Sequence, residues 1–182
     1  MHLLAFIPHR DVFPVLRAYQ RVLFAGGVEG AYSFPPAAPL ALLSRPLSAA
    51  ALKTLAGALR EESLAGGRDG KFRSGPAVVQ DLPELFGSIR ALLGIELDGL
   101  PGTAAPEQAG AEVLYRFPRP ALCTALILNT VPPQDSIPPV FSFRAAALAN
   151  IDLSFRPISA AGSIRGYTAE WETGPLVWLP KL

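Results

Sequence analysis

The sequence predicts an α+β domain, and two observations lead to this fold class. Predicted helices and strands alternate only through the first half of the chain, and the second half is almost entirely strand. Such an order favours antiparallel sheets with segregated helices over a regularly alternating parallel sheet. The second observation is the length of 182 residues, which is typical of one domain. We therefore expect a single domain over residues 1–182.

In the first half, hydrophobic periodicity predicts three strands and three helices. Asp11 is the expected N-cap of the first helix and Ser48 that of the second, because their side-chain oxygens can accept hydrogen bonds from the first turn. Gly26 and Gly27 are expected to end the first helix. The predicted strands are Leu3–Ile7, Leu40–Ser44 and Lys71–Leu82, and the predicted helices are Val12–Phe24, Ala49–Glu62 and Pro83–Leu93.

The second half reads as a succession of short strands. Gly99–Gly110 is rich in Gly, Pro and Ala and is predicted to be a surface loop or a join between two halves, and the proline-rich Val131–Pro139 a second loop. The predicted strands are Glu112–Phe117, Leu122–Thr130, Phe141–Ala146, Asn150–Phe155, Tyr167–Glu172 and Leu176–Leu179.

The chain is apolar in composition but lacks a predicted membrane segment. Half of its residues are hydrophobic and 17% are charged. Its longest apolar runs, Ala37–Leu43 and Ala121–Leu128, are far shorter than the roughly 20 residues that a spanning helix needs. The opening run Leu3–Ile7 is too short for a secretion signal and has no basic leader. The expectation is a cytoplasmic protein with no membrane partner.

Charge and cysteine content exclude further classes of function. A formal net charge of +1 gives no overall field that attracts nucleic acid, although a local basic patch would still be compatible with such binding. The single cysteine, Cys123, excludes an internal disulfide and a multi-cysteine zinc site. It lies in an apolar run, which favours a buried, inert thiol over a nucleophile.

Common catalytic and cofactor motifs are absent from the sequence. Neither Gly26-Gly27 nor Gly66-Gly67 is followed by the Gly-Lys-Ser/Thr of a phosphate loop or by a dinucleotide fingerprint. The only histidines, His2 and His9, have no carboxylate cluster or second cysteine nearby, so no metal site is predicted. No Gly-x-Ser-x-Gly elbow of a serine hydrolase occurs. No cofactor and no metal are expected.

The order of several segments resembles a known family. An apolar strand, Leu3–Pro8, precedes an amphipathic helix, and Phe34–Leu43 precedes a second one. Asn150–Phe155 is followed by Glu170–Glu172 and Trp178–Lys181 at the end of the chain. This layout is similar to that of the 2H phosphoesterase superfamily, which includes 2′-5′ RNA ligase-like proteins and cyclic nucleotide phosphodiesterases. The resemblance implies two pseudo-symmetric lobes of antiparallel sheet with flanking helices around a central groove.

The resemblance also implies where the family chemistry would lie and why it is missing. Family members carry two His-x-Thr motifs, whose histidines act as general base and general acid and whose threonines bind phosphate oxygens. The matching positions hold Ala38 (or Ala37) and Leu40 (or Pro39) in the first motif, and Asn150 and Asp152 in the second. These apolar and amide side chains cannot transfer protons, and an aspartate would repel a phosphodiester. No catalytic residue of the family type is therefore expected.

A polar strand face gives the candidate binding site. Alternation places Asn150, Asp152, Ser154 and Arg156 on one face of a strand. Ser142 and Arg144 alternate in the same way on the preceding strand, so two neighbouring strands could line a ligand groove of mixed charge. An ordinary solvent-facing sheet surface is the alternative interpretation. Asp152 could pair with Arg156 on its own strand or with Arg144 across the strands. Trp171 and Trp178 are interpreted as packing residues rather than base-stacking platforms.

Three hypotheses of function remain open from the sequence. The first is a catalytically degenerate 2H-like protein that binds a nucleotide-like small molecule or a protein partner. The second is an enzyme with relocated chemistry that uses Asp152 with Asn150, or His9. The third is a structural or protein-interaction module, for which an apolar surface patch around Leu40 would be the expected sign.

Overall fold

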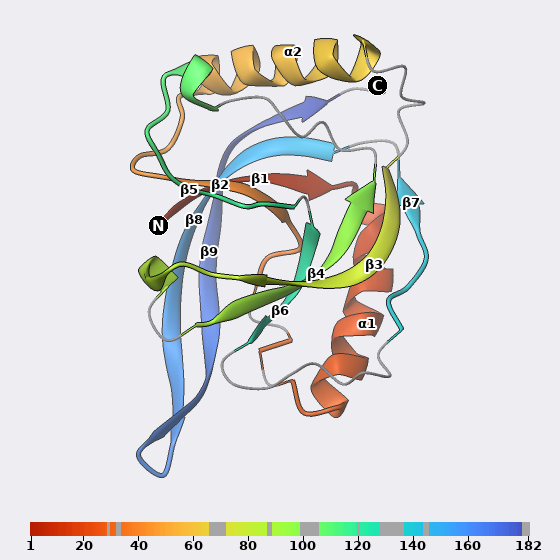
Figure 1. The fold of residues 1–182 in the computed structure, drawn as a ribbon, viewed down its shortest axis with the longest axis vertical. Coiled ribbons are helices and arrows are strands. Elements are labelled where there is room, and N and C mark those ends of the chain that lie inside the picture. The colour runs from red at the N-terminus through yellow and green to blue at the C-terminus, as the bar shows by residue number, and fades with distance from the viewer. Residues whose placement is uncertain are drawn as a thin grey trace.

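The residues that the structure describes form two antiparallel sheets and two α-helices, an α+β architecture with two sheet lobes, one sheet curling into a half-barrel (Figure 1). The predicted fold class is confirmed. The first sheet has the strand order β5-β2-β1-β8-β9 and the second the order β6-β4-β3-β7. The computed structural model describes residues 1–28, 30–31, 34–65, 72–86, 89–98, 106–119, 121–127, 137–143 and 146–179.

The central strand of the first sheet is β1 (His2–Pro8), which is covered on both faces. It pairs with β2 (Ala38–Leu43) on one side and with β8 (Ala146–Ala160) on the other. Its side chains Leu4 and Phe6 join the same core cluster as helix α2, whereas Leu3 and Ala5 join a second cluster that includes Leu92 and Cys123 of the second sheet. Strand β5 (Val113–Arg116) lies outside β2, and β9 (Ser163–Leu179) forms the opposite edge.

The second sheet contains a strand where the sequence predicts a helix. The predicted helix Pro83–Leu93 is wrong: its described residues form a 3₁₀ turn, Glu84–Phe86, and the start of strand β4 at Ala91, while residues 87–88 lie outside the described part. Adjacent side chains Leu92 and Leu93 are buried in the two different core clusters. Only an extended strand with two covered faces can place neighbouring residues in this way. The bounds of this sheet are β3 (Phe72–Asp81), β4 (Ala91–Asp98), β6 (Ala121–Ile127) and β7 (Ser142–Phe143).

The two helices form where the sequence predicts them. Helix α2 (Ala49–Ala65) lies across the first sheet, and the Ser48 hydroxyl accepts a hydrogen bond from the Ala51 N–H at 3.2 Å, which confirms the predicted cap (Figure 1). Helix α1 (Phe13–Ala25) lies beside the second sheet, where Gln20 Nε2 donates to the Thr124 carbonyl at 3.1 Å. The predicted Asp11 cap is wrong. Asp11 lies in the 3₁₀ turn Arg10–Val12 that precedes α1, and its carboxylate contacts His9 instead.

The remaining strands agree with the prediction in type and differ in extent. Strands β3, β5 and β6 coincide with predicted strands. The predicted counterpart of β6 extends to Thr130, and its residues 128–130 lie outside the described part. The predicted loop Gly99–Gly110 includes a 3₁₀ helix, Pro106–Ala109, and residues 99–105 lie outside the described part. Of the predicted loop Val131–Pro139, residues 131–136 also lie outside it. No helix in the described ranges is both long and apolar enough to cross a membrane.

Strands β8 and β9 form one long hairpin in place of three predicted short strands. Ala161 and Gly162 connect them with φ values of 51° and 79°, the left-handed conformation that a two-residue type I′ turn requires. Strand β1 pairs with β8 only as far as Asp152. Beyond Leu153 the hairpin is a two-stranded ribbon, and its tip projects from the body of the molecule (Figure 1).

Candidate functional site

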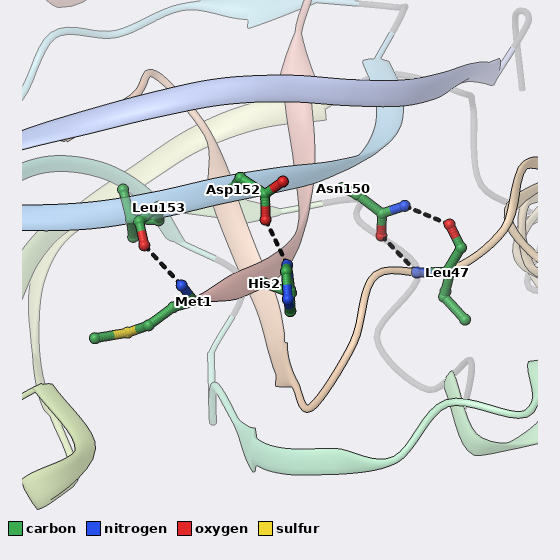
Figure 2. Close-up of polar contacts among 6 residues, drawn as sticks. All are labelled: Met1, His2, Leu47, Asn150, Asp152 and Leu153. Carbon is green, nitrogen blue, oxygen red and sulfur yellow. Dashed lines mark hydrogen bonds and ion pairs between the residues drawn. The ribbon is translucent and has the colours of Figure 1, made fainter.

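Asn150 is a buried structural residue, so the prediction that it lines an open groove is wrong. Its side chain is 3% exposed. The Asn150 amide Nδ2 donates to the Leu47 carbonyl at 2.7 Å, and Oδ1 accepts from the Leu47 N–H at 3.2 Å (Figure 2). Leu47 belongs to the segment that leads into α2, and the loss of this pair would leave two buried backbone groups unpaired. A ligand cannot use this amide unless Leu47 moves away.

Asp152 lies at the surface, two residues further along the same strand. Its Oδ1 contacts Nδ1 of His2, which is opposite it on β1, rather than Arg156 (Figure 2). The next residue, Leu153, donates its backbone N–H to the Met1 carbonyl oxygen at 2.8 Å. This hydrogen bond extends the pairing of β1 with β8 by one step. The sequence does not indicate the His2–Asp152 pair, because the partners are 150 positions apart and only the strand register joins them.

The other predicted site residues do not form one surface with Asn150. Ser154 and Arg156 are exposed on β8, and Arg156 pairs with Glu170 of β9 at 2.9 Å. Ser142 lies on β7, which pairs with β3 in the second sheet. The expectation that its strand adjoins the strand of Asn150 is therefore wrong. Arg144 lies outside the described residues.

The positions that would match the first family motif lie in the packed interior of the first sheet. Ala38 is fully buried opposite Phe6, and Leu40 is half-buried against the core cluster beneath α2. Leu40 falls in a bulge, because Leu4 pairs with Ala41 while Ala5 pairs with Pro39. This strand offers packing contacts and no side-chain group that could bind or transfer a proton.

A second surface, which the sequence analysis did not identify, follows the edge strand β9. Trp171, Thr173 and Leu176 pair with Leu153, Ile151 and Ala149 of β8. Directly opposed residues of an antiparallel pair share a face, so these β9 side chains lie on the face that packs against the second sheet further inward. On β9 these side chains lie beyond the part of the face that the second sheet covers. Trp171 and Leu176 are each 43% exposed, and Trp178 is 50% exposed. The alternation of Trp171 and Thr173 with Glu170 and Glu172 is the signal that the sequence offers, and the edge position of the strand is given by the strand order.

An apolar pocket of about 250 Å³ opens beside this row. Its floor includes Ile151, and Pro35 and Pro36 form part of its wall. The remaining lining residues are Ile7, Phe13, Ala37, Trp171, Thr173 and Leu176. The imidazole of His9 lies 6.2 Å from the Trp178 ring, centroid to centroid, near one end of the row. The pocket can hold one or two aliphatic or aromatic side chains, and it offers almost no polar atoms.

The opposite face of the hairpin is acidic. Glu170 and Glu172 alternate with Trp171, and Glu172 pairs with Asp152 of β8, so the three carboxylates share the other face. All three side chains are exposed, and a shallow hollow of about 390 Å³ lies among them. Arg156 pairs with Glu170, and His2 with Asp152, whereas no described cation contacts Glu172. This face repels phosphate groups and attracts cations.

Cys123 is buried between the sheets and is not part of either surface. Its side chain is 2% exposed, and burial raises the pKa of the thiol far above its usual range. We predict that the folded protein does not react with a disulfide reagent such as DTNB at pH 8, because the thiolate is the reactive form. In denaturant the same thiol should react completely. Rapid labelling of the native state would contradict this assignment.

The described residues contain no group of three or more His, Cys, Asp or Glu side chains placed to hold a metal ion. No protein-family model, curated protein or solved structure matches the chain.

Proposed function

We propose that this chain is a non-catalytic binding protein with a degenerate 2H phosphoesterase-like layout, and that it binds a polypeptide partner on the β8–β9 hairpin. One observation carries the proposal: an apolar pocket with an exposed tryptophan at its rim lies on one face of the β8–β9 hairpin, and three exposed carboxylates lie on the other. Exposed aromatic side chains beside an apolar pocket are typical of protein-binding surfaces.

The geometry favours a polypeptide over a nucleotide. The motif positions Ala38 and Asn150 are buried, and the Asn150 amide hydrogen-bonds to Leu47 through both its oxygen and its nitrogen. The exposed position Asp152 belongs to the acidic face, which disfavours an anionic phosphate by Coulomb repulsion. These features support a protein that does not carry out the family reaction.

Thermal unfolding together with product chromatography tests this function. The panel consists of cyclic mononucleotides, 2′,5′- and 3′,5′-linked oligonucleotides, and p-nitrophenyl acetate as a non-phosphate substrate. We expect no turnover and no stabilisation by the nucleotides. A compound bound at 100 times its dissociation constant would stabilise the native state by about 2.7 kcal/mol, which is readily measured.

Two outcomes would contradict the proposal. Turnover of any cyclic phosphate would show that chemistry survives without the motif histidines. Hydrolysis of p-nitrophenyl acetate that disappears in Asp152→Ala would instead support relocated chemistry, in which Asp152 orients His2 as a general base.

A further inference from the structure

The outer edge of β9 along Ala169–Thr173 is unpaired within the part of the chain that the structure describes. Strand β9 ends the first sheet, and none of the described segments pairs with its outer side. Such an edge presents unpaired backbone N–H and C=O groups that can accept another strand. The available stretch ends at Gly174 and Pro175, where the register with β8 shifts and proline has no N–H to donate.

The two surfaces on this edge can be reached together only by an extended chain. Trp171 and Thr173 face the apolar pocket, whereas Glu170 and Glu172 lie on the acidic face. A compact ligand in the pocket would not contact the carboxylates on the other side of the strand. A strand added alongside β9 places successive side chains on alternate faces and therefore contacts both surfaces.

Charge indicates which extended chain fits. The acidic face holds three carboxylates, of which Glu170 pairs with Arg156 and Asp152 contacts His2, while the amino group of Met1 lies at the edge of the hollow. Glu172 has no cationic partner among the described residues and is the carboxylate left for a basic side chain of a partner. Two copies of β9 paired edge to edge would bring Glu170 and Glu172 of each copy close together, and like charges on neighbouring strands are destabilising. The edge is therefore unsuited to a second copy of this chain. It suits a strand with Lys or Arg on one face.

We propose that β9 binds an extended segment of a partner protein by strand addition along Ala169–Thr173, with apolar side chains toward Trp171 and basic side chains toward Glu170 and Glu172. This inference rests on the proposed function and specifies the chemistry of its partner. Apolar and basic residues would alternate in the bound segment, and an aliphatic or aromatic side chain would enter the pocket.

The test uses three end-blocked nine-residue peptides: alternating Lys and Val, alternating Glu and Val, and a Lys/Val peptide with the same composition in blocks. Binding to the full chain is followed by NMR, through the backbone amides of Ala169–Thr173 and the Trp171 indole, and by hydrogen exchange. We expect the alternating Lys/Val peptide to bind tightest and to protect these amides. We expect the Glu172→Lys variant to bind this peptide about tenfold more weakly than the original chain does, and to bind the Glu/Val peptide more tightly.

Glu61→Lys is the matched control, because it changes the charge equally on the exposed side of α2 and should leave the affinity unchanged. Equal weakening by both variants would overturn the proposal, as would equal affinity for the blocked and alternating peptides, or no peptide binding. Peptide binding that perturbs only residues outside β9 would overturn strand addition while leaving a polypeptide-binding function in place. Turnover in the phosphoester panel would instead remove the proposed function itself.

Discussion

Replacing Asn150 by alanine is expected to lower the free energy of unfolding by about 3 kcal/mol, the largest effect of any polar substitution considered for this protein. The alanine removes both hydrogen bonds to Leu47 and leaves the buried N–H and C=O of that residue without partners. Each unsatisfied buried group costs roughly 1–3 kcal/mol. Urea denaturation followed by circular dichroism measures the change.

Ser154→Ala is the matched control for Asn150→Ala. Ser154 lies on the same strand, four residues further along and on the same face, but it is exposed. Its replacement should change stability by no more than about 0.5 kcal/mol. A similar small change in Asn150→Ala would show that Asn150 does not hold Leu47 in solution, and would return it to the set of candidate ligand-binding residues.

Gly94→Ala is expected to destabilise the second sheet by about 2 kcal/mol, because a Cβ atom has no room between β4 and β6. The added carbon would lie 2.9 Å from Ala121 Cβ and 3.2 Å from the Leu122 carbonyl oxygen. Neither atom belongs to the end of a flexible side chain, so the strands themselves would have to separate. The same urea experiment measures the loss.

Gly57→Ala provides the opposite expectation at a helical glycine. A Cβ at Gly57 of α2 meets no atom within 4 Å, and alanine favours the helix by up to about 1 kcal/mol. The two substitutions add the same methyl group and should change stability in opposite directions. Stabilisation by Gly94→Ala would mean that β4 and β6 are further apart than described.

Local sequence patterns predicted the local structure well where one pattern was dominant. The helical stripe of α1 and the Ser48 cap of α2 are encoded within a few residues, and the alternation of Asp152, Leu153 and Ser154 correctly assigns exposed and buried positions on β8. Leu92 and Leu93 were misassigned because a short apolar run fits a buried strand and a helix equally well.

The candidate site was less predictable because it depends on pairing between distant segments. The side-chain pattern of Asn150 is that of a polar strand face, and nothing near it in the sequence indicates that Leu47 covers it. In the same way, the pattern of Ser142 does not show that β7 joins the second sheet. The opposed faces of Trp171 and Glu172 were available from alternation, but the edge position of β9 required the strand order.

The central position of β1 has a consequence for how the chain folds during synthesis. Strand β1 is synthesised well before β8, yet half of its pairing partners lie on β8, with His2 opposite Asp152. The β8–β9 hairpin closes through a two-residue turn and can form within microseconds once translated. Until β8 has been made, strand β1 has unpaired backbone groups on one side and apolar side chains that the rest of the sheet does not yet cover. A nascent chain halted before β8 is thus expected to depend on chaperones, whereas a chain that includes β8 and β9 can complete its first sheet.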